Sequence, residues 1–332
     1  MDKIDKNIIS RLSARSKISG GVVTTLCENE SADALVRVRN PLHLGYIERN
    51  FDVCGLYPFI RSVAIKCSLK DAVKLERMQE VEYVSAQSKV LALRDDIGNL
   101  TSLNVNFQKN FASDTGDETH KSNQTSSSGD NPAGKRDFHV ENSGLFSPVP
   151  TFDESLDGSG VTLCVMDTGV SPHLDLSVPR ERIVHFVDMI NESAEPYDDN
   201  GHGTFVAGVA AGNGNASARK TAGVAPKANI VGVKVIDDSG ESGTFKILDG
   251  MQWLFDNFRR YDVRVVCMSF GAEPLEYADP LKIGVEMLAR SGLIVVCASG
   301  NSGAGSLKSP AISTEVISVG AVDKNLNVAS FS

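Results

Sequence analysis

The chain has 332 residues, with 41% hydrophobic residues, 23% charged residues and a formal net charge of −9. Such a composition is typical of a globular protein with about two domains. The acidic balance argues against a nucleic-acid-binding surface and against binding to an anionic membrane. No long apolar segment occurs, so the sequence predicts neither a secretory signal peptide nor a membrane span.

Residues 1–95 are predicted to form a small α+β domain. Apolar and charged side chains alternate over residues 34–39, which predicts a strand, and apolar runs at 63–65, 81–84 and 89–93 predict further strands. Residues 68–78 have helical periodicity, and Ser68 is placed to cap this helix.

Residues 96–150 are predicted to be a polar, largely disordered linker. Their centre, residues 112–136, is rich in Ser, Asp, Asn and Gly and has almost no apolar side chains. A segment of this composition cannot bury enough surface to fold. It is either a plain spacer or a site of proteolytic processing, and the residues alone leave both interpretations open.

Residues 151–332 alternate between predicted strands and helices. Apolar runs recur at 161–166, 230–235, 263–268, 293–298 and 316–319, separated by helical patterns at 203–212, 244–260 and 280–291. The runs lack polar alternation, as strands that are buried on both faces do. The sequence therefore predicts an α/β fold with a doubly wound parallel sheet. Ligands of such sheets bind beyond the carboxyl ends of the strands.

Cysteines occur singly. The chain has six, with no CxxC pair and no spacing typical of a metal site. Cys164, Cys267 and Cys297 lie inside apolar runs and are predicted to be buried. Free thiols without an export signal favour a reducing, cytoplasmic setting.

Asp167 and His202 are the candidates for acid–base chemistry. Asp167 ends the first apolar run, and His202 begins a helical pattern between Gly201 and Gly203, which leave room beside the ring. A carboxylate that is hydrogen-bonded to an imidazole fixes its tautomer and stabilises the ring when it takes up a proton. Each residue alone is more often structural, but together they predict a catalytic pair.

Two further positions follow apolar runs. Asn301 lies in a Gly-Asn-Ser-Gly turn, where asparagine is favoured for its backbone conformation. Its side-chain amide is also suited to stabilise an oxyanion. Ser269, Phe270 and Gly271 form either a plain strand end or an extended segment that pairs with a bound peptide.

Motifs in residues 158–332 resemble those of the subtilisin-like serine proteases. The strings VMDTGV (165–170), NGHGTFVAG (200–208) and ASGNSG (298–303) occur in the order found in that family. The strings GVAP, SVGAVD and ASFS, at 223–226, 318–323 and 329–332, match as well. The string EPYDDN before the histidine resembles the intracellular, AprX-type branch.

The resemblance implies a subtilisin-like fold and a serine endopeptidase that acts on polypeptides. In it Asp167 would orient His202, and His202 would act as general base and then general acid. Asn301 would supply the oxyanion-hole amide, and residues 269–271 would line the substrate cleft. No cofactor is needed for this chemistry, and structural calcium is frequent in the family.

The resemblance also assigns a role to the first domain. The ending of residues 1–95, around 81–84, is similar to that of a subtilase propeptide. Residues 1–95 are then expected to act as a folding chaperone and an intramolecular inhibitor of a zymogen.

The chain departs from the family pattern at two places. Phe205 stands where the family often has a second histidine, which is not the proton carrier. The family's nucleophilic serine lies in a Gly-Thr-Ser-Met-Ala motif that this sequence lacks, and Ser332 matches a structural serine instead. We therefore expect the chain alone to be inactive, with the nucleophile supplied by a C-terminal segment or fragment.

Two hypotheses other than a protease remain open at this stage. The first is a catalytically inactive, subtilase-like binding or regulatory module. The second is a metal-dependent hydrolase that uses His202 with Asp198 and Asp199. A solvated turn before a helix explains that acidic pair equally well.

Overall fold

The computed structural model describes residues 3–6, 8, 31–93, 156–323 and 327–332. The described residues of 1–103 and 157–332 belong to one compact unit. The predicted linker, 96–150, lies outside the described residues. Its character and the predicted domain boundaries stay predictions.

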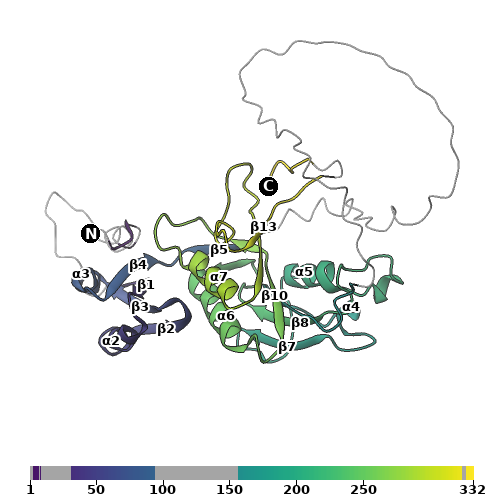
Figure 1. The fold of residues 1–332 in the computed structure, drawn as a ribbon, viewed down its shortest axis with the longest axis horizontal. Coiled ribbons are helices and arrows are strands. Elements are labelled where there is room, and N and C mark those ends of the chain that lie inside the picture. The colour runs from purple at the N-terminus through teal and green to yellow at the C-terminus, as the bar shows by residue number, and fades with distance from the viewer. Residues whose placement is uncertain (1–2, 7, 9–30, 94–155, 324–326) are drawn as a thin grey trace, which may run out of the picture. The chain divides into compact units, whose positions relative to one another are not determined.

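An antiparallel sheet of four strands is formed by the N-terminal region (Figure 1), in the order β2-β3-β1-β4. The elements are β1 (Ser31–Val38), η1 (Pro41–His43), α2 (Leu44–Asn50), β2 (Val53–Tyr57), η2 (Pro58–Ile60), β3 (Ser62–Ser68), α3 (Leu69–Arg77) and β4 (Val81–Ala86). The predicted helix is α3, and Ser68 caps it in a reciprocal capping box with Asp71. The sequence analysis did not predict β2 or α2.

Both faces of this small sheet are buried. Ala34, Val36 and Val38 of β1 pack into a core with α2 and α3, as their alternation predicts. Leu35, on the other face, joins the core that contains helix α6 (Thr244–Asn257). At the same surface the Tyr57 hydroxyl donates a hydrogen bond of 2.8 Å to Asp249 of α6.

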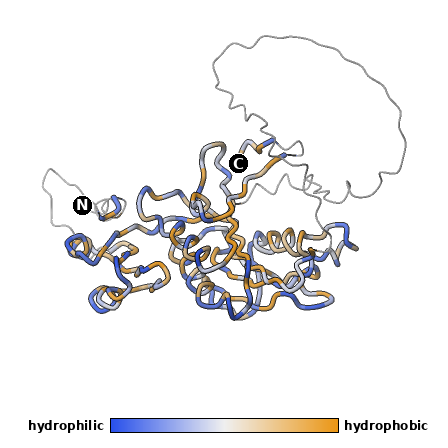
Figure 2. The backbone as a smooth tube through the Cα atoms, in the orientation of Figure 1, coloured by the Kyte–Doolittle hydropathy of each residue, from blue (hydrophilic) through white to orange (hydrophobic). Residues whose placement is uncertain are grey.

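Six parallel strands form the central sheet of residues 157–332, in the order β13-β12-β10-β6-β8-β7. Their bounds are β6 (Thr162–Asp167), β7 (Ile183–Asp188), β8 (Asn229–Lys234), β10 (Val263–Met268), β12 (Ile294–Ala298) and β13 (Ile317–Val319). The predicted doubly wound parallel sheet is confirmed, with β7 as a strand that the sequence analysis missed. Figure 2 shows the hydrophobic stretches of backbone that run through this part of the chain.

Helices cover both faces of the central sheet. Cys164 and Met166 of β6 belong to the core on the side of α6 and α7 (Pro280–Arg290). Leu163 and Val165 belong to a second core, on the side of α5 (His202–Ala211). Burial on both faces explains why these strands read as continuous apolar runs. Short helices α4 (Leu174–Ser177) and η4 (Asn215–Ser217) complete this region.

A third sheet is small and antiparallel. Strand β5 (Lys89–Ala92) lies between β11 (Phe270–Gly271) and β9 (Glu241–Gly243). The end of the N-terminal region is thus paired with two segments of residues 157–332. Within the described residues, no helix has the length and apolar character needed to cross a membrane.

Candidate active site

The carboxyl ends of the parallel strands bring the predicted site residues to one edge of the sheet. Strand β6 lies between β8 and β10, and the chain adds later strands on both sides of it. Such a switch point is where open α/β sheets bind ligands. Asp167, the last residue of β6, lies at this point.

Asp167 and His202 are in direct contact. Nδ1 of His202 is 2.6 Å from Oδ1 of Asp167, and the two side chains are 7% and 0% exposed. His202 is the first residue of α5, and its backbone N–H donates to Oδ1 of Asn200 at 3.2 Å. A buried carboxylate at Nδ1 holds the ring in one orientation and leaves Nε2 for chemistry.

His202 has a second polar neighbour, the backbone of Leu93. Nε2 is 3.3 Å from the Leu93 carbonyl oxygen. A carbonyl oxygen only accepts hydrogen bonds, so this arrangement favours a ring that carries hydrogen on both nitrogens. Burial opposes the charged ring, but the hydrogen bond to Asp167, the charge of Asp167 and the Leu93 carbonyl raise the pKa of His202 above its usual value.

Thr168 joins the aspartate to the start of the helix. Its backbone N–H donates to Oδ1 of Asp167 at 2.7 Å. Its hydroxyl donates to Oδ1 of Asp198 at 2.9 Å and accepts from the N–H of Gly203 at 2.9 Å. The strand that carries Asp167 and the helix that carries His202 are therefore tied through one buried side chain.

Asp198 caps the first turn of α5. It accepts hydrogen bonds from the N–H of Gly201 at 2.8 Å and from the N–H and hydroxyl of Thr204 at 2.8 and 2.7 Å. Burial raises the pKa of Asp198, but these bonds outweigh it and hold the pKa below its usual value. A negative charge here also suits the positive end of the helix dipole.

Gly203 permits the helix to approach the strand closely. A Cβ at this position would lie 2.1 Å from the carbonyl oxygen of Gly169 and 3.0 Å from Cβ of Asp167. The glycine is therefore needed to clear the backbone after β6 rather than the imidazole ring. Gly201 has a φ of 95°, in the left-handed region that favours glycine.

The predicted substrate-lining residues pair with a segment of the same chain. The N–H of Leu93 donates to the carbonyl of Ser269 at 2.9 Å. Phe270 pairs with Ala92 and Gly271 with Leu91, in antiparallel register. On its other edge β5 pairs with β9, and the side chain of its residue Val90 is fully buried. An extended strand hydrogen-bonded on both edges is a form in which peptides are bound.

The sequence analysis missed two parts of this arrangement. It did not predict β9, which is only three residues long. It predicted a strand at 89–93, which is β5, but not that this strand pairs with β9 and β11 and reaches His202. The segment 81–84, which resembles the ending of a propeptide, is β4 and pairs with β1 inside the first sheet.

Asn301 lies in the turn after β12, at the same edge of the sheet as Asp167. Strand register places Met268 level with Met166 of β6 and with Cys297 of β12, so the strands end together. The Asn301 side chain is half-buried. Among the described residues, its side chain makes no hydrogen bond with Asp167 or His202. Its oxyanion role stays a prediction.

The residues proposed for metal binding have other partners. Asp198 caps α5, and Asp199 accepts from Nζ of Lys234 at 2.6 Å. Among the described residues, no group of three or more His, Cys, Asp or Glu side chains is placed to hold a metal ion. Structural calcium stays a prediction. The five cysteines of the described segments carry free thiols.

Comparison with known proteins gives the family. The profile of the subtilase family matches residues 158–332. The chain belongs to the subtilase family. This subtilase domain contains the parallel sheet, Asp167 and His202, so the predicted family and fold class are confirmed.

The curated relatives of the subtilase domain are proteases. The chain is 43% identical over 186 residues to the serine protease AprX of Bacillus subtilis (strain 168), covering 53% of this chain and 41% of AprX. It is 38% identical over 180 residues to subtilisin Savinase of Lederbergia lenta, covering 54% of this chain and 62% of that protein. The matches thus span about half the length of these relatives, and the AprX match agrees with the predicted AprX-type resemblance.

Ser332 has a structural contact in this subtilase domain. Its hydroxyl accepts a hydrogen bond of 2.8 Å from the N–H of Ala321. The interpretation of Ser332 as a structural serine is consistent with this bond. Phe205, at the position of the family's second histidine, is 56% exposed on α5 and does not take part in the Asp167–His202 contact.

Proposed function

We propose that the protein is a serine endopeptidase whose general base is His202, oriented by Asp167. The observation that carries this proposal is the 2.6 Å contact between the two side chains, with a backbone carbonyl 3.3 Å from Nε2. A neutral Nε2 at that place can take a proton from an attacking hydroxyl and return it to the leaving amine. The family match and the protease relatives support the same chemistry.

In this proposal the substrate binds as β5 does. Ser269, Phe270 and Gly271 supply one edge strand for an extended peptide, and β9 supplies the other. Main-chain pairing of this kind is nearly independent of side-chain identity, and pockets for alternate side chains give the preference. Asn301 would donate its amide to the oxyanion of the tetrahedral intermediate, where one such donor contributes roughly 10²–10³ in rate.

The nucleophilic serine is proposed to come from outside residues 1–332. No family nucleophile motif occurs in this sequence, and the hydroxyl of Ser332 is engaged with Ala321. Without its serine, a triad enzyme retains only a small part of its rate enhancement. The relatives are longer than the matched region, which is consistent with a nucleophile in another segment or fragment.

Residues 89–93 are proposed to act as an intramolecular inhibitor. They pair with both strands that a substrate would pair with, β11 and β9, and the Leu93 carbonyl contacts the candidate base. This agrees with a propeptide role for residues 1–95 and with a zymogen that is activated by loss of this segment. A reducing, cytoplasmic setting is proposed on the free cysteines of the described residues.

A fluorophosphonate probe tests the proposal directly. Applied to the full-length protein that contains this chain, the probe should label one serine outside residues 1–332 and abolish peptide hydrolysis. A binding or regulatory module would show neither labelling nor hydrolysis. After chelation with EDTA, labelling should persist for as long as circular dichroism shows the protein to be folded, which separates serine chemistry from metal-dependent hydrolysis and from loss of structural calcium.

A further inference from the structure

The ammonium of Lys234 is completely enclosed at the carboxyl end of β8. The side chain is 0% exposed and lies in register with Asp167 on the neighbouring strand. Burying an ammonium is unfavourable unless all its donors are paired. Nζ donates to the Thr168 carbonyl at 2.5 Å, to Oδ1 of Asp199 at 2.6 Å and to the Ile236 carbonyl at 2.9 Å.

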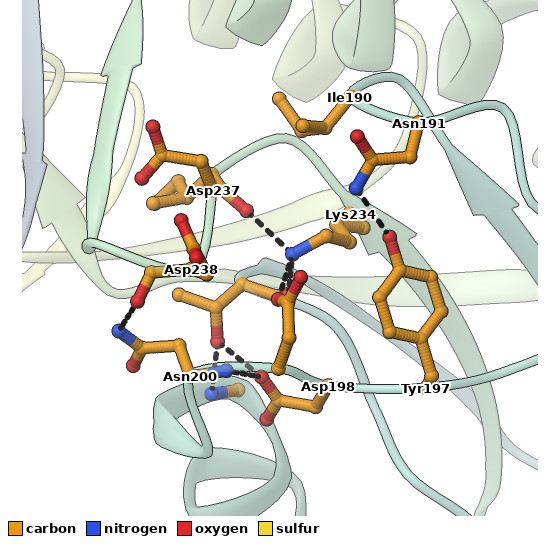
Figure 3. Close-up of polar contacts among 12 residues, drawn as sticks. Ile190, Asn191, Tyr197, Asp198, Asn200, Lys234, Asp237 and Asp238 are labelled. Carbon is orange, nitrogen blue, oxygen red and sulfur yellow. Dashed lines mark hydrogen bonds and ion pairs between the residues drawn. The ribbon is translucent and has the colours of Figure 1, made fainter.

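The three acceptors belong to three separate segments. Thr168 directly follows β6, Asp199 lies in the loop before α5, and Ile236 begins the loop that leads to β9. Figure 3 shows the Lys234 ammonium with Tyr197 on one side of it and Asp237 on the other. The Tyr197 ring lies 5.2 Å from Nζ, at cation–π distance. One buried charge thus ties the segment after β6 and the loop before α5 to the end of its own strand, β8.

The segment of Thr168 positions Asp167, and the loop of Asp199 positions His202. The N–H of Thr168 donates to the same Asp167 oxygen that contacts His202. The loop of Asp199 continues through Asn200, whose Oδ1 accepts from the N–H of His202. A shift of either segment would change the distance or the angle between the carboxylate and the imidazole.

The third segment reaches the substrate side. Nδ2 of Asn200 donates to the Asp238 carbonyl at 2.9 Å, as Figure 3 shows. Asp237 accepts from the N–H of Glu241 at 2.9 Å, which sets the start of β9. Strand β9 is one of the two strands that hold β5 in front of His202. The hydrogen bonds around Lys234 therefore connect His202 to β9, one of the two strands proposed to bind the substrate.

We propose that Lys234 is a positioning residue, which with Asp199 holds the Asp167–His202 pair and strand β9 in the geometry needed for hydrolysis. This inference rests on the proposed peptidase function. Small displacements of catalytic groups lower the rate strongly, since a shift of about 1 Å reduces it by roughly 10²-fold. The alternative is a buried ion pair that only stabilises the fold.

The decisive variant is Lys234→Met in the full-length protein, because methionine keeps the chain length and removes the charge. The matched control is Arg182→Met. Arg182 is a second buried cation, 3% exposed, that donates to the carbonyls of Ala228 and of Ala211, the latter at the opposite end of α5 from His202. Both variants should unfold at lower temperature than the wild type, since both remove a buried cation with several acceptors.

Only Lys234→Met should lose catalysis at a temperature where both variants are folded. We expect kcat to fall by about 10²-fold with little change in KM, and Arg182→Met to stay within about threefold. Equal losses in both variants, or a kcat for Lys234→Met near that of the wild type, would overturn the proposal.

A second readout does not depend on the nucleophile. The proton between His202 Nδ1 and Asp167 should give a low-field proton NMR signal, because the contact is only 2.6 Å. We expect this signal to shift or broaden in Lys234→Met and to persist in Arg182→Met. An unchanged signal in Lys234→Met would refute the positioning role even if the wild type proved to have no peptidase activity.

Asp199→Asn covers the case in which Lys234→Met does not fold. The Asp199 side chain is 33% exposed, and the amide oxygen of asparagine can still accept from Nζ of Lys234, so the charge is lost while the buried ammonium keeps an acceptor. It should produce the same fall in kcat and the same change in the NMR signal, each to a smaller extent. In a double-mutant cycle the effects of the two substitutions should not add, because both break one pair. Full additivity would mean that the pair does not act as a unit.

Discussion

The carbonyl oxygen of Leu93 lies 3.3 Å from Nε2 of His202. On its other side the ring contacts Asp167, so the candidate base is held between a carboxylate and a peptide group of its own chain. The N–H of Leu93 donates to the Ser269 carbonyl at 2.9 Å, which holds this residue beside the ring. This arrangement makes specific predictions about activity, processing and pH.

His202→Ala should remove hydrolysis. In triad enzymes, loss of the base lowers kcat by about 10⁶-fold, because the nucleophile can no longer be deprotonated. The measurement is kcat for a peptide substrate with the full-length protein. His43→Ala, a histidine of the N-terminal region outside the site, is the control and should leave kcat unchanged. Comparable hydrolysis by His202→Ala would exclude the ring from the mechanism.

Processing should occur directly after Leu93. The Leu93 carbonyl contacts Nε2, β5 is held on both edges up to Ala92, and the N–H of Leu93 is bonded to Ser269. Mass spectrometry of the full-length protein should therefore find an N-terminal fragment that ends at Leu93. The fragment should be absent from the His202→Ala protein. Fragments that end only within residues 104–156 would indicate cleavage by another protease.

Residues 89–93 should bind more tightly between β11 and β9 at low pH. Burial acts against the charged ring, but Asp167, Leu93 and the charge of Asp198 raise the pKa of His202. Of these groups the Leu93 carbonyl is the one that leaves with residues 89–93, and we expect its loss to lower the pKa of His202. A group whose pKa is raised in the bound state stabilises that state fully below its pKa in the free state. The contribution is lost as the pH rises through the pKa of the bound state. Release of residues 89–93 should therefore increase with pH across this window.

Gly271→Val tests this coupling. A Cβ at Gly271 would lie 2.8 Å from Cβ of Lys308 and 3.3 Å from Cδ1 of Leu93, so valine should push β5 away. We expect the pKa of His202, followed by NMR of the ring, to be lower in Gly271→Val than in the wild type. An equal or higher pKa would contradict the contribution of the Leu93 carbonyl.

Gly203→Ala should destabilise the fold, although both residues are compatible with a helix. The new methyl group would meet the Gly169 carbonyl at 2.1 Å, and overpacking of this kind costs about 1–3 kcal/mol. Gly208→Ala in the same helix is the control, because a Cβ there meets nothing within 4 Å. It should stabilise the protein by up to about 1 kcal/mol through helix propensity. Thermal unfolding of both variants gives the comparison, and equal stabilities would contradict the predicted clash.

The sequence by itself determined the fold class and the chemistry of two residues. The apolar runs at 161–166 and 230–235 read as strands because β6 and β8 are buried on both faces. Asp167 and His202 stand out because a carboxylate after such a run and a histidine between glycines have few structural explanations together. These are local patterns, and a sequence records local patterns directly.

Only the tertiary structure decided which segments meet. Strand β5 pairs with β9 and β11, which lie about 150 and 180 residues further along the chain, and main-chain pairing of this kind has no side-chain signature. Likewise Lys234 reads as one polar residue at the end of a strand, and Asp199 as part of a solvated turn. Their ion pair exists because the ends of β6 and β8 and the loop before α5 converge, and burial there leaves the ammonium no water to bind.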